Sequence, residues 1–390
     1  MSQTKYISDN QKRKIYEIYN CVRVENMERE LGYRTVQSTG RGSFIMSLPK
    51  KWAQEIGINK GSLIAIKITE DRSLVLIPRT MEEKKNEKPE ISKEYFVEVD
   101  HRSDPESVCR RLTSLYATGA ELIHLSFKDI ENSKDFKAAV TNLVRNLLLG
   151  TEIVEETTDE MSLQVLINHP ELPIEKAINR MANLSISAHR DSILALGDLE
   201  QDKLQYINRR KMDVERLNLY VVRQLKYGIE HNLFGDWGFK TSKEFLGYRL
   251  VANDIKNIAG NAYSIATNIK TLRRLIDDKI LFLNDIVDEE IYNQIDSFNS
   301  LTQQLFKESL ESLFNRDYVQ ADRILSRLES FLVLENDLIT LLLNKKIDPN
   351  LLAIYRLVLD NTRKIVEYSK EIAEVTLNRT VEAASVQSQS

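Results

Sequence analysis

Residues 34–79 run RTVQSTGRGSFIMSLPKKWAQEIGINKGSLIAIKITEDRSLVLIPR and combine short apolar runs with concentrated positive charge. Residues 31–80 carry eight Lys or Arg against three Asp or Glu, a net charge of +5, whereas the whole 390-residue chain carries −4. Residues 1–30 contribute +1, so residues 81–390 hold −10. A positive β-rich module on an acidic body predicts a unit that binds a polyanion.

The composition predicts a soluble globular protein. Hydrophobic residues make up 42% and charged residues 29% of a chain long enough for two or three domains. No run approaches the roughly 18 apolar residues of a membrane helix, and the polar start MSQTKYISDNQKRK lacks the apolar region of a secretory signal. Cys21 and Cys109 are the only cysteines, which indicates neither a disulfide framework nor a zinc site. We therefore expect a cytoplasmic protein that is not an integral membrane protein.

The chain before residue 171 divides into four predicted segments. Residues 1–26 form an N-terminal extension, and residues 27–80 form the basic β-rich domain. The charge-dense stretch MEEKKNEKPE, residues 81–90, indicates a linker. Within residues 91–170 the pattern predicts strand, helix, strand, helix and two closing strands. This βαβαββ order predicts a small α/β middle domain whose helices cover one face of a sheet.

From residue 171 onward the periodicity is helical. Apolar residues recur at steps of three and four along six stretches of roughly 25–35 residues each. The stretches at about 174–276 and 288–378 have matching lengths, so we predict two three-helix repeats within a helical domain of residues 171–378. Residues 379–390 lack apolar periodicity and are predicted to form a disordered tail. The expected fold class is therefore multidomain and mainly α.

The basic module carries a motif that resembles the AbrB/SpoVT DNA-binding domain. The residues that carry the resemblance are Gly40-Arg41, Ser47-Leu48-Pro49-Lys50, Ile56-Gly57-Ile58, Gly61 and Ile77-Pro78. The resemblance implies that two chains interleave their hairpins into one swapped-hairpin β-barrel, which makes the protein a homodimer that binds double-stranded DNA. The residues expected to contact phosphates are Arg34, Arg41, Lys50 and Lys51. Such contacts weaken as salt rises, because each one releases counterions from the duplex.

Two departures from the family pattern leave an alternative open. Family members often carry an arginine pair further along the short helix, where this chain has Ala53 and Gln54. The loop GRGSFIMS before the proline is also longer. Lys50 and Lys51 are candidates to replace the missing arginines. The alternative is that the basic residues form only a solvated rim on a dimerisation barrel.

Residues 172–378 resemble the PhoU family of phosphate uptake regulators, through the tandem three-helix architecture and the segment LGYRLVANDIKNIAGNAYSIA at 246–266. That family carries carboxylates at E/D-x-x-x-D spacing, which places two on one helix face to bind a metal cluster. The matching positions here are Arg209 and Asp213, Lys256 and Gly260, Arg363 and Glu367, and Leu328 and Leu332. Because a cationic side chain repels a metal ion, we expect neither a metal nor a cofactor. Asp213, Asp254 and Glu367 are interpreted as solvated or ion-paired acids.

The sequence contains no catalytic signature. Its five histidines have no paired ligand spacing, and His124 lies in an alternating strand, where a structural role is expected. GRGSF is not followed by the G-K-[ST] of a phosphate-binding loop, and G-x-S-x-G is missing. We therefore expect no enzyme activity.

Together these features predict a phosphate uptake regulator that acts as a DNA-binding transcriptional regulator. The basic domain of residues 27–80 is expected to be the output surface, which binds DNA. The helical body or the middle domain is expected to be the input surface, which receives the signal. The alternative is a dimeric adaptor that does not bind DNA and inhibits a phosphate transporter or signalling protein by direct contact. The expected partners are a second copy of the chain, double-stranded DNA, and phosphate-transport or signalling proteins.

Overall fold

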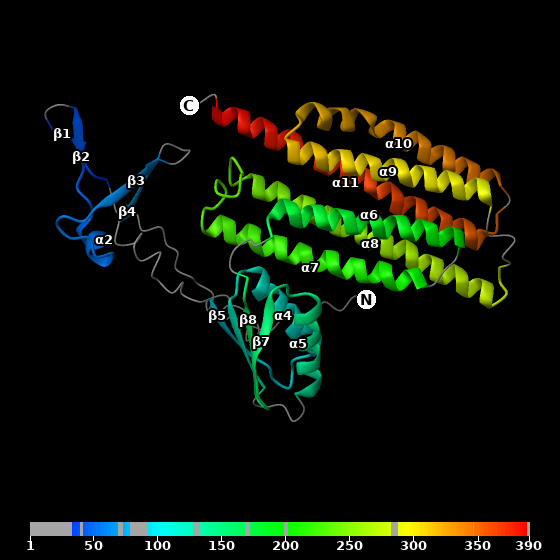
Figure 1. Cartoon of the computed structure of the whole chain (residues 1–390), viewed down its shortest axis with the longest axis horizontal. Helices are drawn as coiled ribbons and strands as arrows, with labels where there is room; N and C mark the ends of the chain where they lie inside the picture. Colours follow the sequence, from blue (N-terminus) through cyan, green and yellow to red (C-terminus); the bar gives the residue numbers. More distant parts are fainter. Residues whose placement is uncertain are drawn as a thin grey trace, which may run out of the picture. The chain divides into compact units, whose positions relative to one another are not determined.

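The computed structural model is mainly helical, with a small strand-containing part near its N-terminus and a helical C-terminal body, as the sequence predicts (Figure 1). It describes residues 33–39, 42–68, 73–78, 93–127, 133–167, 172–198, 202–281, 288–345 and 347–387. The chain forms two compact units, Met1–Lys88 and Pro89–Ser390. Within the described ranges, every helix falls short of the length and apolarity that a bilayer crossing requires.

The described residues of the N-terminal unit form two antiparallel hairpins and one short helix. Their bounds are β1 Gln37–Thr39, β2 Ser43–Ile45, α2 Lys50–Glu55, β3 Ile64–Ile68 and β4 Leu74–Pro78. Gly57 follows α2 with φ +74°, a left-handed conformation that glycine adopts without strain. Among the described residues, β1 pairs with β2 and β3 with β4, as two separate sheets. The interleaved barrel, which requires a second chain, therefore stays a prediction.

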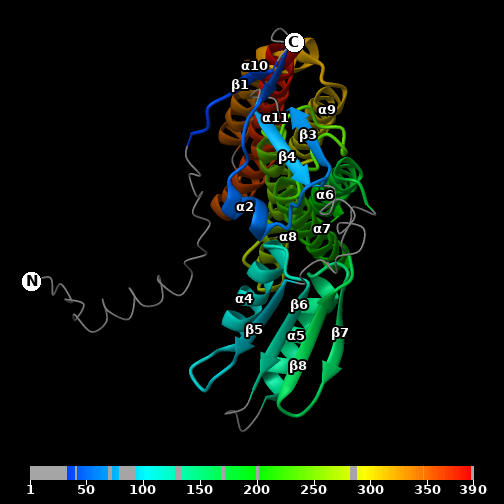
Figure 2. The same cartoon turned by 90° about the vertical axis from the view of Figure 1, so that its left-hand side faces the viewer.

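The middle domain is a four-stranded sheet with two helices packed on one face. Its elements are β5 Glu94–Glu98, α4 Pro105–Ala117, β6 Leu122–Ser126, α5 Lys134–Asn146, β7 Thr151–Glu156 and β8 Glu160–Val165. The strand order is β5-β6-β8-β7, with β5 and β6 parallel and the other pairs antiparallel. Val97, Ile123 and Leu163 point to the helical side, where they share one core with Leu112 of α4 and Val140 of α5. Among the described residues of the second unit, no helix lies over the opposite face of the sheet (Figures 1 and 2).

Six long helices form the C-terminal body. They are α6 Ile174–Asp198, α7 Asp202–Glu230, α8 Glu244–Asp277, α9 Glu289–Asn315, α10 Tyr318–Asn344 and α11 Pro349–Gln387. Helices α6, α7 and α8 contact one another, as do α9, α10 and α11. The two sets meet where α8 packs on α11 and α6 on α9, and both large hydrophobic cores include residues of both sets. Gly247 permits the close approach of α8 to α11, because a Cβ atom there would lie 2.6 Å from Val375 Cγ1.

A buried cluster around Glu244, at the start of α8, ties four helices together. Glu244 forms ion pairs with Arg379 of α11 and, at 3.0 Å, with Arg316 at the end of α9. The Arg379 guanidinium lies 5.0 Å from the centre of the Tyr248 ring, and the Tyr248 hydroxyl donates to Glu175 Oε1 of α6 at 2.6 Å. Burial alone would raise the pKa of Glu244, but the hydrogen bond and charge of Arg379 hold this pKa below its ordinary value.

This Glu244 cluster explains why the structure differs from the predicted disordered tail at residues 379–390. Helix α11 continues to Gln387, and Arg379 is buried instead of solvated. Arg379 also donates to the Leu313 carbonyl of α9 at 2.7 Å. Apolar periodicity does not detect this extension, because a charged side chain makes the contacts. Residues 388–390 lie outside the described residues.

One buried arginine anchors the middle domain on the helical body. Arg223 of α7 donates to the carbonyls of Tyr116 and Ala120, both at 2.8 Å, at the C-terminal end of α4. Tyr116 lies in the last turn of α4, whose carbonyls have no intrahelical partner, and Ala120 follows the helix; a cation also suits the negative end of the helix dipole. Lys93, just before β5, forms an ion pair with Glu230 of α7. The middle domain therefore docks on α7 through polar contacts at two points.

Replacement of Arg379 by methionine tests the Glu244 cluster. R379M keeps the side-chain bulk but leaves the buried Glu244 carboxylate with less compensation, which is expected to destabilise the helical body by about 3–5 kcal/mol. Thermal and urea unfolding followed by circular dichroism measure the destabilisation. K370M on the same helix is the control, because the Lys370–Glu374 pair is exposed and is expected to contribute less than about 1 kcal/mol. Equal stability of R379M and K370M would contradict the proposed importance of the cluster.

Candidate functional site

The structure exposes the three predicted DNA-contact residues that it describes. Lys50 and Lys51 are consecutive at the start of α2, and Arg34 lies before β1 with its guanidinium near the Tyr33 carbonyl at 3.3 Å. Arg41 lies outside the described residues. In a single chain, Arg34 and the two lysines belong to separate segments, and no shared sheet within the described ranges holds them together. Their assignment as phosphate contacts stays a prediction.

The β3–β4 hairpin of the N-terminal unit has one wholly apolar face. The strand register places six side chains on that face: Ile64, Ile66, Ile68, Leu74, Leu76 and Pro78. Ile66, Ile68 and Leu74 are 64%, 76% and 63% exposed. An isolated two-stranded hairpin is at best marginally stable in water, so this face requires a cover.

The rest of the N-terminal unit, as far as the structure describes it, does not provide that cover. Phe44 and Ile45 of β2 are themselves 76% and 54% exposed, and α2 has no buried residue. Among the side chains of this unit that the structure describes, Pro78 alone is buried. The N-terminal unit therefore exposes apolar strands that in a stable protein are covered. Such a surface is typical of one subunit of an oligomer seen without its partner.

The helical positions at which the PhoU resemblance suggests carboxylates form no metal site in the described part of the chain. Arg363 pairs with Asp360 at 3.1 Å, with Glu335 at 3.5 Å and with Glu367, so Glu367 is ion-paired as expected. Across the described ranges, no group of three or more His, Cys, Asp or Glu side chains lies close enough to hold a metal ion. Arg363 therefore neutralises its acidic neighbours.

Asp254 of α8 corrects the interpretation of the surviving acids as solvated or ion-paired. Its side chain is buried, with the residue 3% exposed, and its Oδ2 atom has no hydrogen-bond partner among the described residues. Burial, together with the nearby carboxylate of Glu371 on α11, raises the pKa of Asp254 from 3.8 to about 8. Asp254 is therefore a neutral acid at pH 7 between two helices of different sets. Helical periodicity places it beside the apolar stripe, but the sequence does not show which neighbour covers it.

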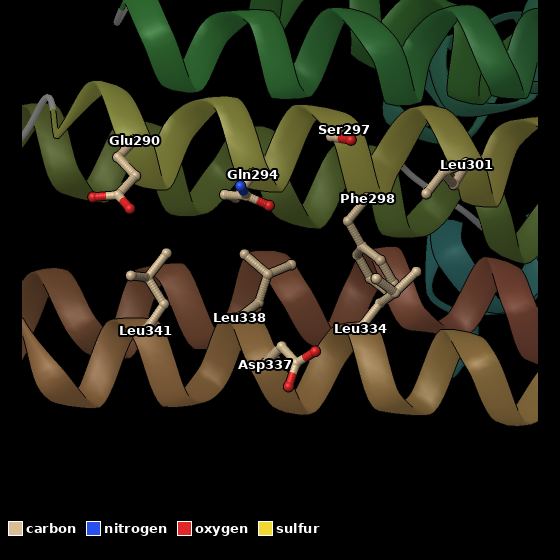
Figure 3. A pocket seen from close by; sticks show the side chains of 9 residues that line it. All are labelled: Glu290, Gln294, Ser297, Phe298, Leu301, Leu334, Asp337, Leu338 and Leu341. Atoms are coloured by element: carbon tan, nitrogen blue, oxygen red, sulfur yellow. The ribbon is translucent and has the colours of Figure 1, made fainter.

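A groove runs between α9 and α10 in the helical body (Figure 3). Its volume is about 310 Å³, and its lining residues are Glu290, Gln294, Ser297, Phe298, Leu301, Leu334, Asp337, Leu338 and Leu341. Figure 3 shows Phe298 of α9 and Leu334 of α10 pointing toward one another across the groove. Leu301 and Leu334 are 38% and 40% exposed. Because the lining combines apolar residues with Glu290, Gln294, Ser297 and Asp337, the groove suits an amphipathic helix.

Sequence reasoning missed the outward face of the middle sheet. Phe96 of β5 is 71% exposed, and its ring stacks on His124 of β6 with centroids 4.9 Å apart. His124 Nδ1 lies 3.0 Å from Ser162 Oγ of β8. The alternation of side chains along Glu94–Glu98, EYFVE, does predict this feature, because it places Phe96 on the same face as the two glutamates.

Comparison with known proteins reaches the N-terminal unit alone. Residues 37–84 match the family described as "Antidote-toxin recognition MazE, bacterial antitoxin", whose domain has the AbrB/SpoVT-like fold. The resemblance of this unit to AbrB/SpoVT domains is thereby confirmed, and such a domain is compatible with DNA-binding regulation. No curated protein matches the chain. The matched residues do not extend to the helical body, whose likeness to PhoU stays a prediction.

Replacement of Asp254 by asparagine tests its burial as a neutral acid. The pKa of Asp254 is about 8 in the folded state and near 3.8 in the unfolded state. Between these pH values folding requires Asp254 to take up a proton, so the wild-type chain loses stability as pH rises from about 4 to about 8. D254N cannot ionise, so its melting temperature is expected to exceed that of the wild type by an amount that grows between pH 5 and pH 8. The control is D213N on α7, which is half-buried. A difference that is constant with pH would contradict the assignment.

Proposed function

We propose that the protein is a dimeric DNA-binding regulator whose N-terminal unit is completed by a second copy of the chain. The observation that carries the proposal is the apolar face of the β3–β4 hairpin, exposed within residues 31–80, whose net charge is +5. A second hairpin buries the two apolar faces against each other. At about 25 cal/mol per Å² of apolar surface, this burial supplies the stability that one chain lacks.

Dimerisation also supports the binding of double-stranded DNA. One chain presents Arg34, Lys50 and Lys51 at exposed positions, and a symmetric dimer doubles these charges on one assembly. Contacts to phosphates position a protein on DNA without reading its sequence, and they account for steep salt dependence. Such a role requires a compartment that contains DNA, which agrees with the expected cytoplasmic location. It requires no catalysis and no cofactor.

The regulated process that we propose is phosphate uptake. Its support is limited to the order and pairing of the six helices, which are those expected for two PhoU-like three-helix repeats. Under this proposal the helical body receives the signal without binding a metal, because Arg363 holds the acids that would be ligands. Comparing the genomic sites occupied by the protein in phosphate-rich and phosphate-starved cells tests the process separately from DNA binding.

A second candidate function is the dimeric adaptor that contacts a phosphate transporter or signalling protein. The α9–α10 groove favours this candidate, because Leu301 and Leu334 leave an apolar surface on the helical body. The adaptor needs the dimer but not the cations of the N-terminal unit. DNA binding by that unit therefore separates the two candidates.

The Lys50→Ala/Lys51→Ala variant tests the DNA contacts. Its affinity for duplex DNA at low salt is expected to fall by roughly tenfold or more, and the slope of log affinity against log salt is expected to fall by about one for each phosphate that the variant no longer neutralises. Fluorescence anisotropy over a salt series measures both. The control is K176A/K370A, which removes two exposed cations of the helical body. Negligible binding by the wild-type chain would favour the adaptor.

The Ile66→Asp variant tests dimerisation. It places a charge on the apolar face of β3–β4, so sedimentation of the full chain at micromolar concentration is expected to show dimers for the wild type and single chains for I66D. N59D is the control, because it adds the same charge at an exposed position of the same unit that lies outside the hairpin. A wild-type protein that sediments as a single chain would refute the dimer.

A further inference from the structure

The outward face of the middle sheet carries its side chains in three rows that follow from the strand register. The first row is Glu98, Ser126 and Glu160; the second is Phe96, His124, Ser162 and Glu155; the third is Glu94, Leu122, Gln164 and Glu152. We call these residues the acidic sheet face. Five of them are glutamates, and none is a lysine or arginine.

The negative charge of the acidic sheet face is not compensated within the described part of the chain. No described lysine or arginine forms an ion pair with any of the five glutamates. Asp100, just beyond the end of β5, provides the contrast, because Arg102 pairs with it at 3.0 Å and lowers its pKa. The basic residues of α4 and α5 lie on the other side of the sheet. Carboxylates gathered in this way repel one another, and a cation placed among them relieves the repulsion.

The face is hollowed over its first two rows. A depression of about 480 Å³ lies there, because Ser126 and Ser162 are small while Phe96, Glu98, Glu155 and Glu160 stand around them, and it extends at one end to Asp100, which is paired with Arg102. Glu98 and Glu160 lie on either side of Ser126, roughly 10 Å apart at the spacing of two strands. A guanidinium placed over Ser126 can reach both carboxylates, and the exposed Phe96 ring offers a surface on which it stacks.

The chemistry of the face excludes several occupants. Phosphates of nucleic acids and of anionic lipids are repelled by the five carboxylates. The described residues group no three acids closely enough to hold a metal ion. The three rows and four strands cover an area of roughly 13 Å by 14 Å. This area is larger than a single small amine and is similar in size to a short stretch of polypeptide. Phe96 and Leu122 add apolar contact area that a free polyamine does not use.

We propose that the acidic sheet face is the docking surface for an arginine-containing segment of a partner protein, held by Glu98 and Glu160 and stacked on Phe96. The occupant is argued from charge complementarity and from the exposed ring of Phe96, which lies in the middle row on the edge strand β5. The proposal concerns the middle domain and goes beyond DNA binding, so either one stands if the other fails. It gives the middle domain the role of an input surface that recognises a basic protein segment.

A labelled peptide tests the proposal on the full chain. The probes are a fluorescein-labelled nonapeptide of alternating arginine and glycine and the same peptide with lysine in place of arginine. Anisotropy is expected to show saturable binding, with the arginine peptide bound roughly fivefold more tightly, because a guanidinium stacks on an aromatic ring better than an ammonium does. Phe96→Ser is expected to abolish this preference. Glu98→Gln/Glu160→Gln is expected to weaken both peptides by roughly tenfold or more.

The matched control is Glu106→Gln/Asp135→Asn, which removes two exposed acids from the helical layer on the other side of the sheet. It is expected to bind both peptides as the wild type does. Hydrogen exchange on peptide binding is expected to slow in β5, β6 and β8, and circular dichroism verifies that each variant is folded. The proposal would be overturned if the control weakened peptide binding as much as the Glu98→Gln/Glu160→Gln variant does, or if exchange slowed only in α4 and α5. It would also be overturned if spermine at the peptide's own concentration displaced the peptide, or if binding did not saturate at millimolar peptide.

Discussion

The ion pairs of Glu244 are the constraint on which the arrangement of the long helices depends. A buried carboxylate is tolerated only where charges and donors compensate it, and here Arg379 and Arg316 come from helices of the other set. The Glu244–Arg379 pair links α8 to α11 close to Gly247, where the two helices approach each other. Loss of either partner would leave the other charge buried with less compensation. The extension of α11 through Arg379 follows from the same requirement.

Local patterns in the sequence predict most of the elements, because each depends on its own residues. Helix α4, the first of the two helices predicted within residues 91–170, spans Pro105–Ala117, with Asp104 accepting from the Ser107 amide at 2.8 Å. What the sequence does not reveal is which surfaces remain uncovered. The burial of Asp254 and Arg379 and the exposure of Phe96 all depend on neighbours far away along the chain. Of the predicted DNA contacts, Arg34, Lys50 and Lys51 are exposed, but no single-chain pattern shows whether a dimer brings them together.

The two compact units each leave one face uncovered, for opposite physical reasons. In the N-terminal unit the uncovered face is apolar, and water drives it toward a surface of its own kind. In the middle domain the face is acidic with an exposed aromatic ring on its edge strand, and electrostatics favour a partner of the opposite charge. Under the two proposals, self-association and recognition of a different protein use separate surfaces. A dimer of this kind would exchange its protein partner without dissociating.

The mixing of residues from both helix sets in each large core has a consequence for how the body can be divided. Most buried residues of one core come from α6–α8 and most of the other from α9–α11, and each core is completed by a smaller share from the other set. A set made alone would therefore keep most of one core but expose the surface that the other set covers. Two fragments separated between α8 and α9 should thus bind each other through these surfaces without a covalent link.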